Sequence, residues 1–192
     1  MSKSFKHIYQ FKIVLKYTKP PVWRRIQVPE TYSFWDLQCA IQDAMGWTNS
    51  HLHLFEMQNP ITSERSTIEI IDEDTPNLMT NHSGLDQIIS SWFSMNNRSC
   101  VYVYDMGDNW NHRVTLEKII PREDVTYPRC LSGKRACPPE DCGSIPGYED
   151  ICRGEYEFQE EYEEYDPEKF DAGEVIFDDP DEAWDFAYGL FQ

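Results

Sequence analysis

The order of strand-like and helix-like runs is the feature that most restricts how this chain can fold. Residues 8–17 and 22–29 alternate between apolar and polar side chains, the pattern of half-buried strands. In the first run the predicted buried face consists of Tyr9, Phe11, Ile13, Leu15 and Tyr17. Residues 51–57 and 66–71 predict further strands. Residues 100–105 and 110–120 flank a Gly-Asp-Asn turn and predict a hairpin.

Helical signals are fewer and lie between these runs. Residues 33–46 predict the strongest helix, with Ser33 as N-cap, Asp36 completing a capping box and Gly46 as left-handed C-cap. Residues 83–93, 155–165 and 179–191 predict three more helices, the last with Pro180 in its first turn. The succession indicates an α+β fold: a mostly antiparallel sheet with packed helices, a cysteine-rich loop and an acidic C-terminal helical segment.

Charge divides the chain into two parts. Residues 1–148 hold 17 acidic and 15 basic residues, whereas residues 149–192 hold 17 acidic residues against Arg153 and Lys169. We therefore expect one domain, with an α+β body over 1–148 and an acidic helical extension over 149–192 that packs on it. Such a tail repels nucleic acid and anionic membranes. The N-terminal strand, rich in lysine, is either a solvated sheet face or the docking site of this tail.

The stretch from Cys130 to Cys152 holds four of the six cysteines, spaced C-x6-C-x4-C-x9-C. Neither an N-terminal apolar leader nor a membrane-length apolar run is visible, so we expect a cytoplasmic protein with reduced thiols. Clustered thiols then predict a structural Zn²⁺ site. Its ligands are Cys130, Cys137, Cys142 and Cys152, with His51, His53 or His112 as alternatives to the fourth. A disulfide or redox pair, or simple packing of reduced thiols, stay open as other interpretations.

Two other groups of residues suggest chemistry. His51 and His53 lie two apart on a predicted strand, a spacing that places both rings on one face. Asp105, Asp108 and His112 gather at the predicted hairpin and suit metal ligation or acid–base work, although Asp and Asn are also the residues that a tight turn favours. A third possibility is base stacking near Arg24 and Arg25, although aromatic residues at regular strand and helix positions are more often core and the acidic tail opposes nucleic acid. The aromatic residues concerned are Trp23, Trp35, Trp47, Trp92, Tyr102 and Tyr104.

Several stretches together resemble the plasmid pRiA4b ORF-3-like family. They include "FWDLQCAIQDAMGW", "HLHLF", "YDMGDNWNHRVTLEKI" and "CLSGKRACPPEDCG", with "YDPEKFDAGEV" near the C-terminus. The resemblance implies an α+β domain of largely unknown function that sometimes carries a resolvase-like label. This acidic chain lacks a serine among arginines, as a serine recombinase would need. Gly143-Ser144 replaces the paired glycines usual in the family, and Cys152 is not a family position.

The leading functional hypothesis is a non-enzymatic module that binds a protein partner and holds zinc in the cysteine loop. No nucleotide-binding loop or protease motif is present in the sequence. The alternatives are a metal-dependent hydrolase or nuclease that uses Asp105, Asp108, His112 and the His51–His53 pair, and a nucleic-acid-associated protein.

Overall fold

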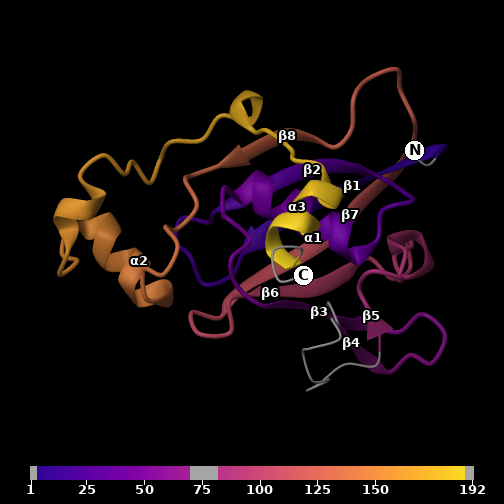
Figure 1. Ribbon diagram of the computed structural model, residues 1–192, viewed down its shortest axis with the longest axis horizontal. Helices are drawn as coiled ribbons and strands as arrows, with labels where there is room; N and C mark the ends of the chain where they lie inside the picture. The colour runs from indigo at the N-terminus through magenta and orange to yellow at the C-terminus, as the bar shows by residue number, and fades with distance from the viewer. Residues whose placement is uncertain (1–3, 70–81, 189–192) are drawn as a thin grey trace.

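The computed structural model describes residues 4–69 and 82–188, which form an eight-stranded sheet and its covering helices (Figure 1). The strand order is β5-β4-β3-β6-β7-β1-β2-β8. Only the short β4–β5 pair is parallel among these neighbours, so the predicted mostly antiparallel α+β fold is confirmed. The strands are β1 (His7–Leu15), β2 (Trp23–Pro29), β3 (His53–Gln58), β4 (Arg65–Glu69), β5 (His82–Ser83), β6 (Ser99–Tyr104), β7 (Trp110–Pro121) and β8 (Arg129–Lys134).

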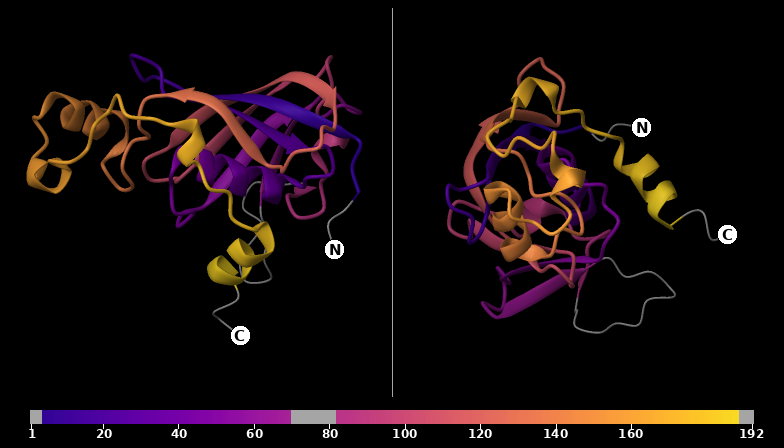
Figure 2. Two further views of the ribbon diagram at one scale, coloured as in Figure 1. Left: turned by 90° about the horizontal axis from the view of Figure 1, so that it is seen from above. Right: turned by 90° about the vertical axis from the view of Figure 1, so that its left-hand side faces the viewer.

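The helices gather on one side of the sheet and at one end of it. They are α1 (Phe34–Met45), α2 (Ser144–Arg153) and α3 (Pro180–Tyr188), with 3-10 turns η1 (Ile89–Ser91), η2 (Gln159–Tyr162) and η3 (Ala172–Glu174). Figure 2 shows the curved sheet enclosing α1, while α2 and η2 project beyond the end of the sheet. The chain then returns over β8 to α3, which lies against α1.

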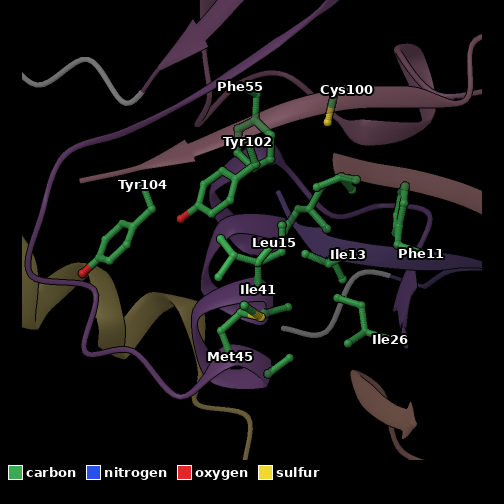
Figure 3. Close-up of a cluster of buried hydrophobic side chains, with 14 of the residues drawn as sticks. Phe11, Ile13, Leu15, Ile26, Ile41, Met45, Phe55, Cys100, Tyr102 and Tyr104 are labelled. Atoms are coloured by element: carbon green, nitrogen blue, oxygen red, sulfur yellow. The ribbon is translucent and has the colours of Figure 1, made fainter. Parts of the chain in front are cut away.

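Helix α1 lies at the centre of the core. Interactions with neighbouring residues fix where it begins and ends. The Ser33 hydroxyl accepts a hydrogen bond from the Asp36 amide, and the Asp36 carboxylate accepts one from the Ser33 amide. Gly46 ends the helix in the left-handed conformation (φ 97°). The apolar face then packs into the concave face of the sheet, where Ile41 and Met45 meet Ile13 and Leu15 (Figure 3). This confirms the predicted helix and both of its caps.

The predicted helix over residues 83–93 is wrong. Only the turn η1 is helical there, and Ile88 is extended and bridges to Ser33. The carbonyl oxygens of Gly84 and Gln87 instead accept hydrogen bonds from the amides of Trp35 and Phe34. These amides open α1 and have no partner within the helix. Because two of its carbonyls bond to α1, the segment forms a turn over residues 84–86, an extended Ile88 and the turn η1 in place of one continuous helix.

Three further predictions about local structure need correction. The acidic run 155–165 forms only the turn η2, and Tyr17 lies beyond the end of β1 with 69% of its surface exposed. The tail does not dock on the basic strand: α3 packs on α1, where the rings of Trp184 and Trp35 lie 5.3 Å apart. Residues 70–71 of the predicted strand 66–71 and residues 189–191 of the predicted helix 179–191 lie outside the described residues.

The cysteine stretch is not one loop. Residues 129–134 form β8, which pairs with β2, and residues 144–153 form α2. Neither element is apparent in the periodicity of the sequence. Cys130 is therefore held in a strand, Cys137 and Cys142 lie in the segment that joins β8 to α2, and Cys152 lies in α2.

Candidate metal site at the end of the sheet

Three segments meet beside the β6–β7 turn and fix one another by hydrogen bonds. The Trp47 indole donates to the Pro138 carbonyl (2.9 Å), which joins the segment after α1 to the Pro-Pro-Glu-Asp-Cys run. Asp108 in the β6–β7 turn accepts from the Gly143 amide (3.2 Å) through its side chain and from the Ser144 hydroxyl (2.7 Å) through its carbonyl. The positions of side chains from all three segments are thereby set relative to one another.

His51, Asp105 and Asp141 come together at this junction, one from each segment. The His51 Nε2 atom lies 3.0 Å from Asp141 Oδ1 and 3.9 Å from Asp105 Oδ2. Their ligand atoms all lie within 4.8 Å of one another, which holds for no other group of three or more His, Cys, Asp and Glu residues in the part of the chain that the structure describes. Atoms bound to one ion at ~2.1 Å are about 3–4 Å apart, so the group has the dimensions of a metal site.

The two aspartates reach this point through unusual backbone conformations. Asp105 and Asp141 have φ angles of 56° and 54°, in the left-handed region that non-glycine residues seldom adopt. The amide of Asp105 donates to the Leu52 carbonyl (2.9 Å), which ties the start of the turn to the His51 segment. Asp105 is 7% exposed, whereas the Asp141 side chain is 72% exposed. The group is thus buried on one side and open to solvent on the other.

Glu140 lies at the edge of this group and is oriented by its neighbours. Its Oε1 atom accepts hydrogen bonds from the Thr48 amide (2.9 Å), the Thr48 hydroxyl (3.1 Å) and the Tyr104 hydroxyl (3.0 Å). Its Oε2 atom is buried without a hydrogen-bond partner, 4.0 Å from His51 Nε2, which is likewise buried without one. Buried polar atoms ordinarily have a partner, so a cation on His51 Nε2 with a bound water toward Glu140 Oε2 would satisfy both.

The other predicted histidine ligands lie in the core. His53 packs against the Trp35 and Tyr102 rings, and the His112 Nδ1 atom lies 3.3 Å from the Tyr102 carbonyl. Burial lowers the pKa of each imidazole to about 3, so both rings are neutral near pH 7. The structure thus joins Asp105 to His51 but leaves Asp108, His53 and His112 outside the group.

The four predicted cysteine ligands do not form a comparable group among the described residues. Cys130 and Cys137 both lie within electrostatic range of the Arg24 guanidinium, a buried cation that would oppose a nearby Zn²⁺. Burial raises the pKa of the Cys142 thiol to about 12, and it also raises the pKa of Cys130 and Cys137. These thiols are protonated in the metal-free protein, and zinc would have to displace their protons.

Sequence reasoning missed Glu140 and Asp141. Both lie inside "CPPEDCG", a stretch that drew attention for its cysteines, and neither has a spacing that points to His51 or Asp105. The signal that was available was a pair of acidic residues in a Pro/Gly-rich turn, beside two candidate thiol ligands.

Fold and site together define an α+β protein with a curved antiparallel sheet and an imidazole–carboxylate group at one end of it. The family model described as "Plasmid pRiA4b ORF-3-like protein" matches residues 7–178, so the chain belongs to that family, as the sequence predicted. Uncharacterized protein y4hQ of Sinorhizobium fredii is 31% identical over 158 residues, which cover 76% of this chain and 71% of that protein.

A solved structure shows the same fold. The crystal structure of MM3350, a protein of unknown function from Methanosarcina mazei Go1, matches with a TM-score of 0.80 and 40% sequence identity. The match covers 91% of this chain and all of that one. Within residues 4–69 and 82–188, no helix combines the length and the apolar character that a membrane crossing needs.

Proposed function

We propose that this protein binds a divalent metal ion through His51, Asp105 and Asp141, in a site that keeps coordination positions open. The observation that carries the proposal is the buried His51 Nε2 atom, which lies 3.0 Å and 3.9 Å from one oxygen of each aspartate but is not aligned for a hydrogen bond with either. One imidazole and two carboxylates suit Zn²⁺, Mn²⁺ or Fe²⁺ better than Ca²⁺, which prefers oxygen ligands alone.

The open side of the site favours metal-assisted hydrolysis over a purely structural ion. Structural zinc sites are closed by four protein ligands, whereas catalytic sites have three and a bound water. An ion at such a position supplies a water of lowered pKa. Glu140 is oriented by Thr48 and Tyr104 and leaves one oxygen free to accept a proton at the site. This supports the metal-dependent hydrolase among the functions that the sequence left open.

Manganese titration followed by electron paramagnetic resonance tests the binding proposal, because free Mn²⁺ gives a six-line signal that is lost on binding. We expect one site, with affinity at least tenfold weaker in His51→Ala and in Asp105→Asn. The asparagine keeps the shape of Asp105 and can still accept the hydrogen bond from the Gly107 amide (2.8 Å). His7→Ala and Asp124→Asn are matched controls on exposed residues outside the site. Equal affinities in all four variants would refute the site.

The number of waters on the bound ion separates the hydrolase from a structural role. Line broadening of the bound Mn²⁺ signal in ¹⁷O-enriched water reports directly coordinated water. At least one such water is expected, because only three protein groups surround the ion. A bound ion without any water would contradict the catalytic assignment and favour a non-enzymatic, structural ion.

Structural zinc in the cysteine stretch is the competing proposal. Replacing Cys130, Cys137, Cys142 and Cys152 by serine, and measuring the zinc content after dialysis, distinguishes the two sites. If zinc is retained by this variant and lost from His51→Ala, the imidazole–carboxylate site holds it. The reverse result would support the thiolate centre and overturn the assignment made here.

A further inference from the structure

A groove runs between the body of the protein and the segment of residues 165–176, which returns from η2 toward α3. His51 does not line this groove. The chain from Tyr165 to Ile176 crosses the end of α1 and the segment that follows β8, and a cavity of about 620 Å³ lies beneath it. Its floor includes Met45, Trp47 and Pro138, all buried. A cavity of this size lies within the ~300–1,000 Å³ range of ligand-binding pockets.

The returning chain is firmly attached along one side of the groove. The Phe170 ring lies 3.7 Å from the Arg24 guanidinium, and the Tyr165 hydroxyl donates to the Cys137 carbonyl (2.9 Å). The Pro167 carbonyl accepts hydrogen bonds from the Ala136 amide (3.1 Å) and from the side chain of Arg135 (3.2 Å). The groove wall is therefore a fixed part of the fold.

The lining of the groove is strongly acidic. Seven of its lining residues are acidic, and two, Arg24 and Lys169, are basic. The Arg24 side chain is 1% exposed and donates to the carbonyls of Ala44, Trp23 and Lys134, so its charge does not face a ligand. Glu161, Glu164 and Asp171 along the returning chain are exposed.

The acidic charge of the groove is spread along its length. None of these carboxylates joins a group of three metal-ligating residues in the described part of the chain. A single small cation would gain little from charges so dispersed, whereas a flexible chain with several cationic side chains can place one near each. The charge therefore favours an extended, multivalent cationic ligand.

Apolar and aromatic surface accompanies this charge. Tyr162 and Tyr165 line the groove beside the acidic residues, and tyrosine rings attract lysine and arginine side chains. Ile176 at its edge is 79% exposed, and Trp47 lies on the floor. Apolar surface next to carboxylates fits a ligand that carries aliphatic residues between its positive charges.

From these features we infer that the groove binds a basic, partly aliphatic peptide segment of a partner protein. The exposed Glu161, Glu164 and Asp171 pair with lysine or arginine side chains of the peptide. Trp47 and Ile176 contact the aliphatic side chains that lie between those positive charges. Glu140 lines both the groove and the edge of the metal site. The inference does not depend on metal binding, because Glu164, Asp171 and Ile176, which the tests below change, lie outside the group of His51, Asp105 and Asp141.

Fluorescence anisotropy with the full-length protein tests this inference. The probe is a fluorescein-labelled 12-residue peptide with four lysines and four leucines separated by serines. Glu164→Lys with Asp171→Lys should weaken binding at least tenfold. Asp124→Lys with Glu64→Lys changes net charge equally on exposed residues outside the groove and should weaken binding less than twofold. Equal losses in the two double variants would show general charge attraction and overturn the inference.

Two further measurements test the aliphatic part of the inference. Ile176→Ser, a change on a side chain that is already exposed, should weaken binding of the probe severalfold without lowering the melting temperature. A peptide with its leucines replaced by serine should bind at least tenfold more weakly than the probe. Equal binding of both peptides, or no binding of the probe at all, would refute the proposed partner class.

Discussion

The Gly147→Ala variant tests the close packing of Gly147 against the backbone of Cys142. This packing shapes the loop that carries Glu140 and Asp141. Gly147 lies in α2, and its amide donates to the Gly143 carbonyl (3.2 Å). A Cβ atom at this position would overlap the Cys142 carbonyl oxygen and lie 2.8 Å from the carbonyl carbon. Because the obstructing atoms are backbone, the start of α2 and the preceding loop would have to separate.

The sign of this effect is opposite to that expected from helix propensity. Alanine in place of glycine inside a helix stabilises by about 1 kcal/mol when nothing obstructs it. Forcing a methyl group into a closely packed position costs roughly 1–3 kcal/mol or more, and the contact here is with rigid backbone at far below van der Waals distance. Because rigid backbone cannot yield, we expect a cost at or above the upper end of this range, about 3–4 kcal/mol, which leaves a net loss of about 2–3 kcal/mol in the free energy of unfolding. At ~2–4 °C per kcal/mol this lowers the melting temperature by roughly 4–12 °C.

Thermal and urea unfolding of purified protein measure this change. Gly154→Ala is the matched control, because the same added methyl group has nothing within 4 Å there. Gly154 ends α2 with φ of 71°, so its replacement costs only the ~1–2 kcal/mol of a left-handed side chain. An unchanged or higher melting temperature in Gly147→Ala would refute the close packing of α2 on the Cys142 carbonyl.

Three other predictions concern the tail and the charge of the molecule. Burial, with the nearby Asp178 charge, raises the pKa of Asp43 to about 7, against 3.8 in the unfolded chain. The native state thus holds a proton that the unfolded state has lost, and the unfolding free energy falls as pH rises from about 4 to 7. Between pH 5 and pH 8 this loss of unfolding free energy should amount to ~1–2 kcal/mol, once the partial exposure of Asp43 is discounted. Urea unfolding at the two pH values should show the loss in the native protein and not in Asp43→Asn. Ending the chain after Tyr165 removes α3 from Trp35 and Phe170 from Arg24, so light scattering should detect association. A monomer with an unchanged melting temperature would argue against that packing. Duplex DNA should bind more weakly than ~10⁻⁴–10⁻⁶ M at physiological salt, and tighter, salt-sensitive anisotropy titrations would contradict the charge argument.

The elements that were predicted correctly are those whose formation depends on residues close together in the sequence. Strands β1 and β2 follow from side-chain alternation, and the β6–β7 hairpin follows from two such runs around a turn. The ends of α1 follow from Ser33 and Gly46, because each acts on neighbours within a few residues. Patterns and caps that act over a few residues can be interpreted without knowing what the rest of the chain does.

Tertiary structure decided the remaining elements. The run 83–93 has helical periodicity but forms only short turns around Ile88, because its Gly84 and Gln87 carbonyls accept hydrogen bonds from the first amides of α1. Strand β8 exists because the exposed edge of β2 offers partners to residues 129–134. Each outcome depends on a segment distant in sequence, and local propensity contains no information about it.

The candidate site shows the same division. The sequence identified His51 and Asp105 from separate local settings, and it combined them only in the hydrolase alternative, together with Asp108, His112 and His53. Glu140 and Asp141 join them only because the Trp47 indole and Asp108 anchor the Pro-Pro-Glu-Asp-Cys run beside the hairpin. The sequence alone thus determined which chemical groups the chain carries. Contacts between segments more than 30 residues apart decided which of those groups face one another.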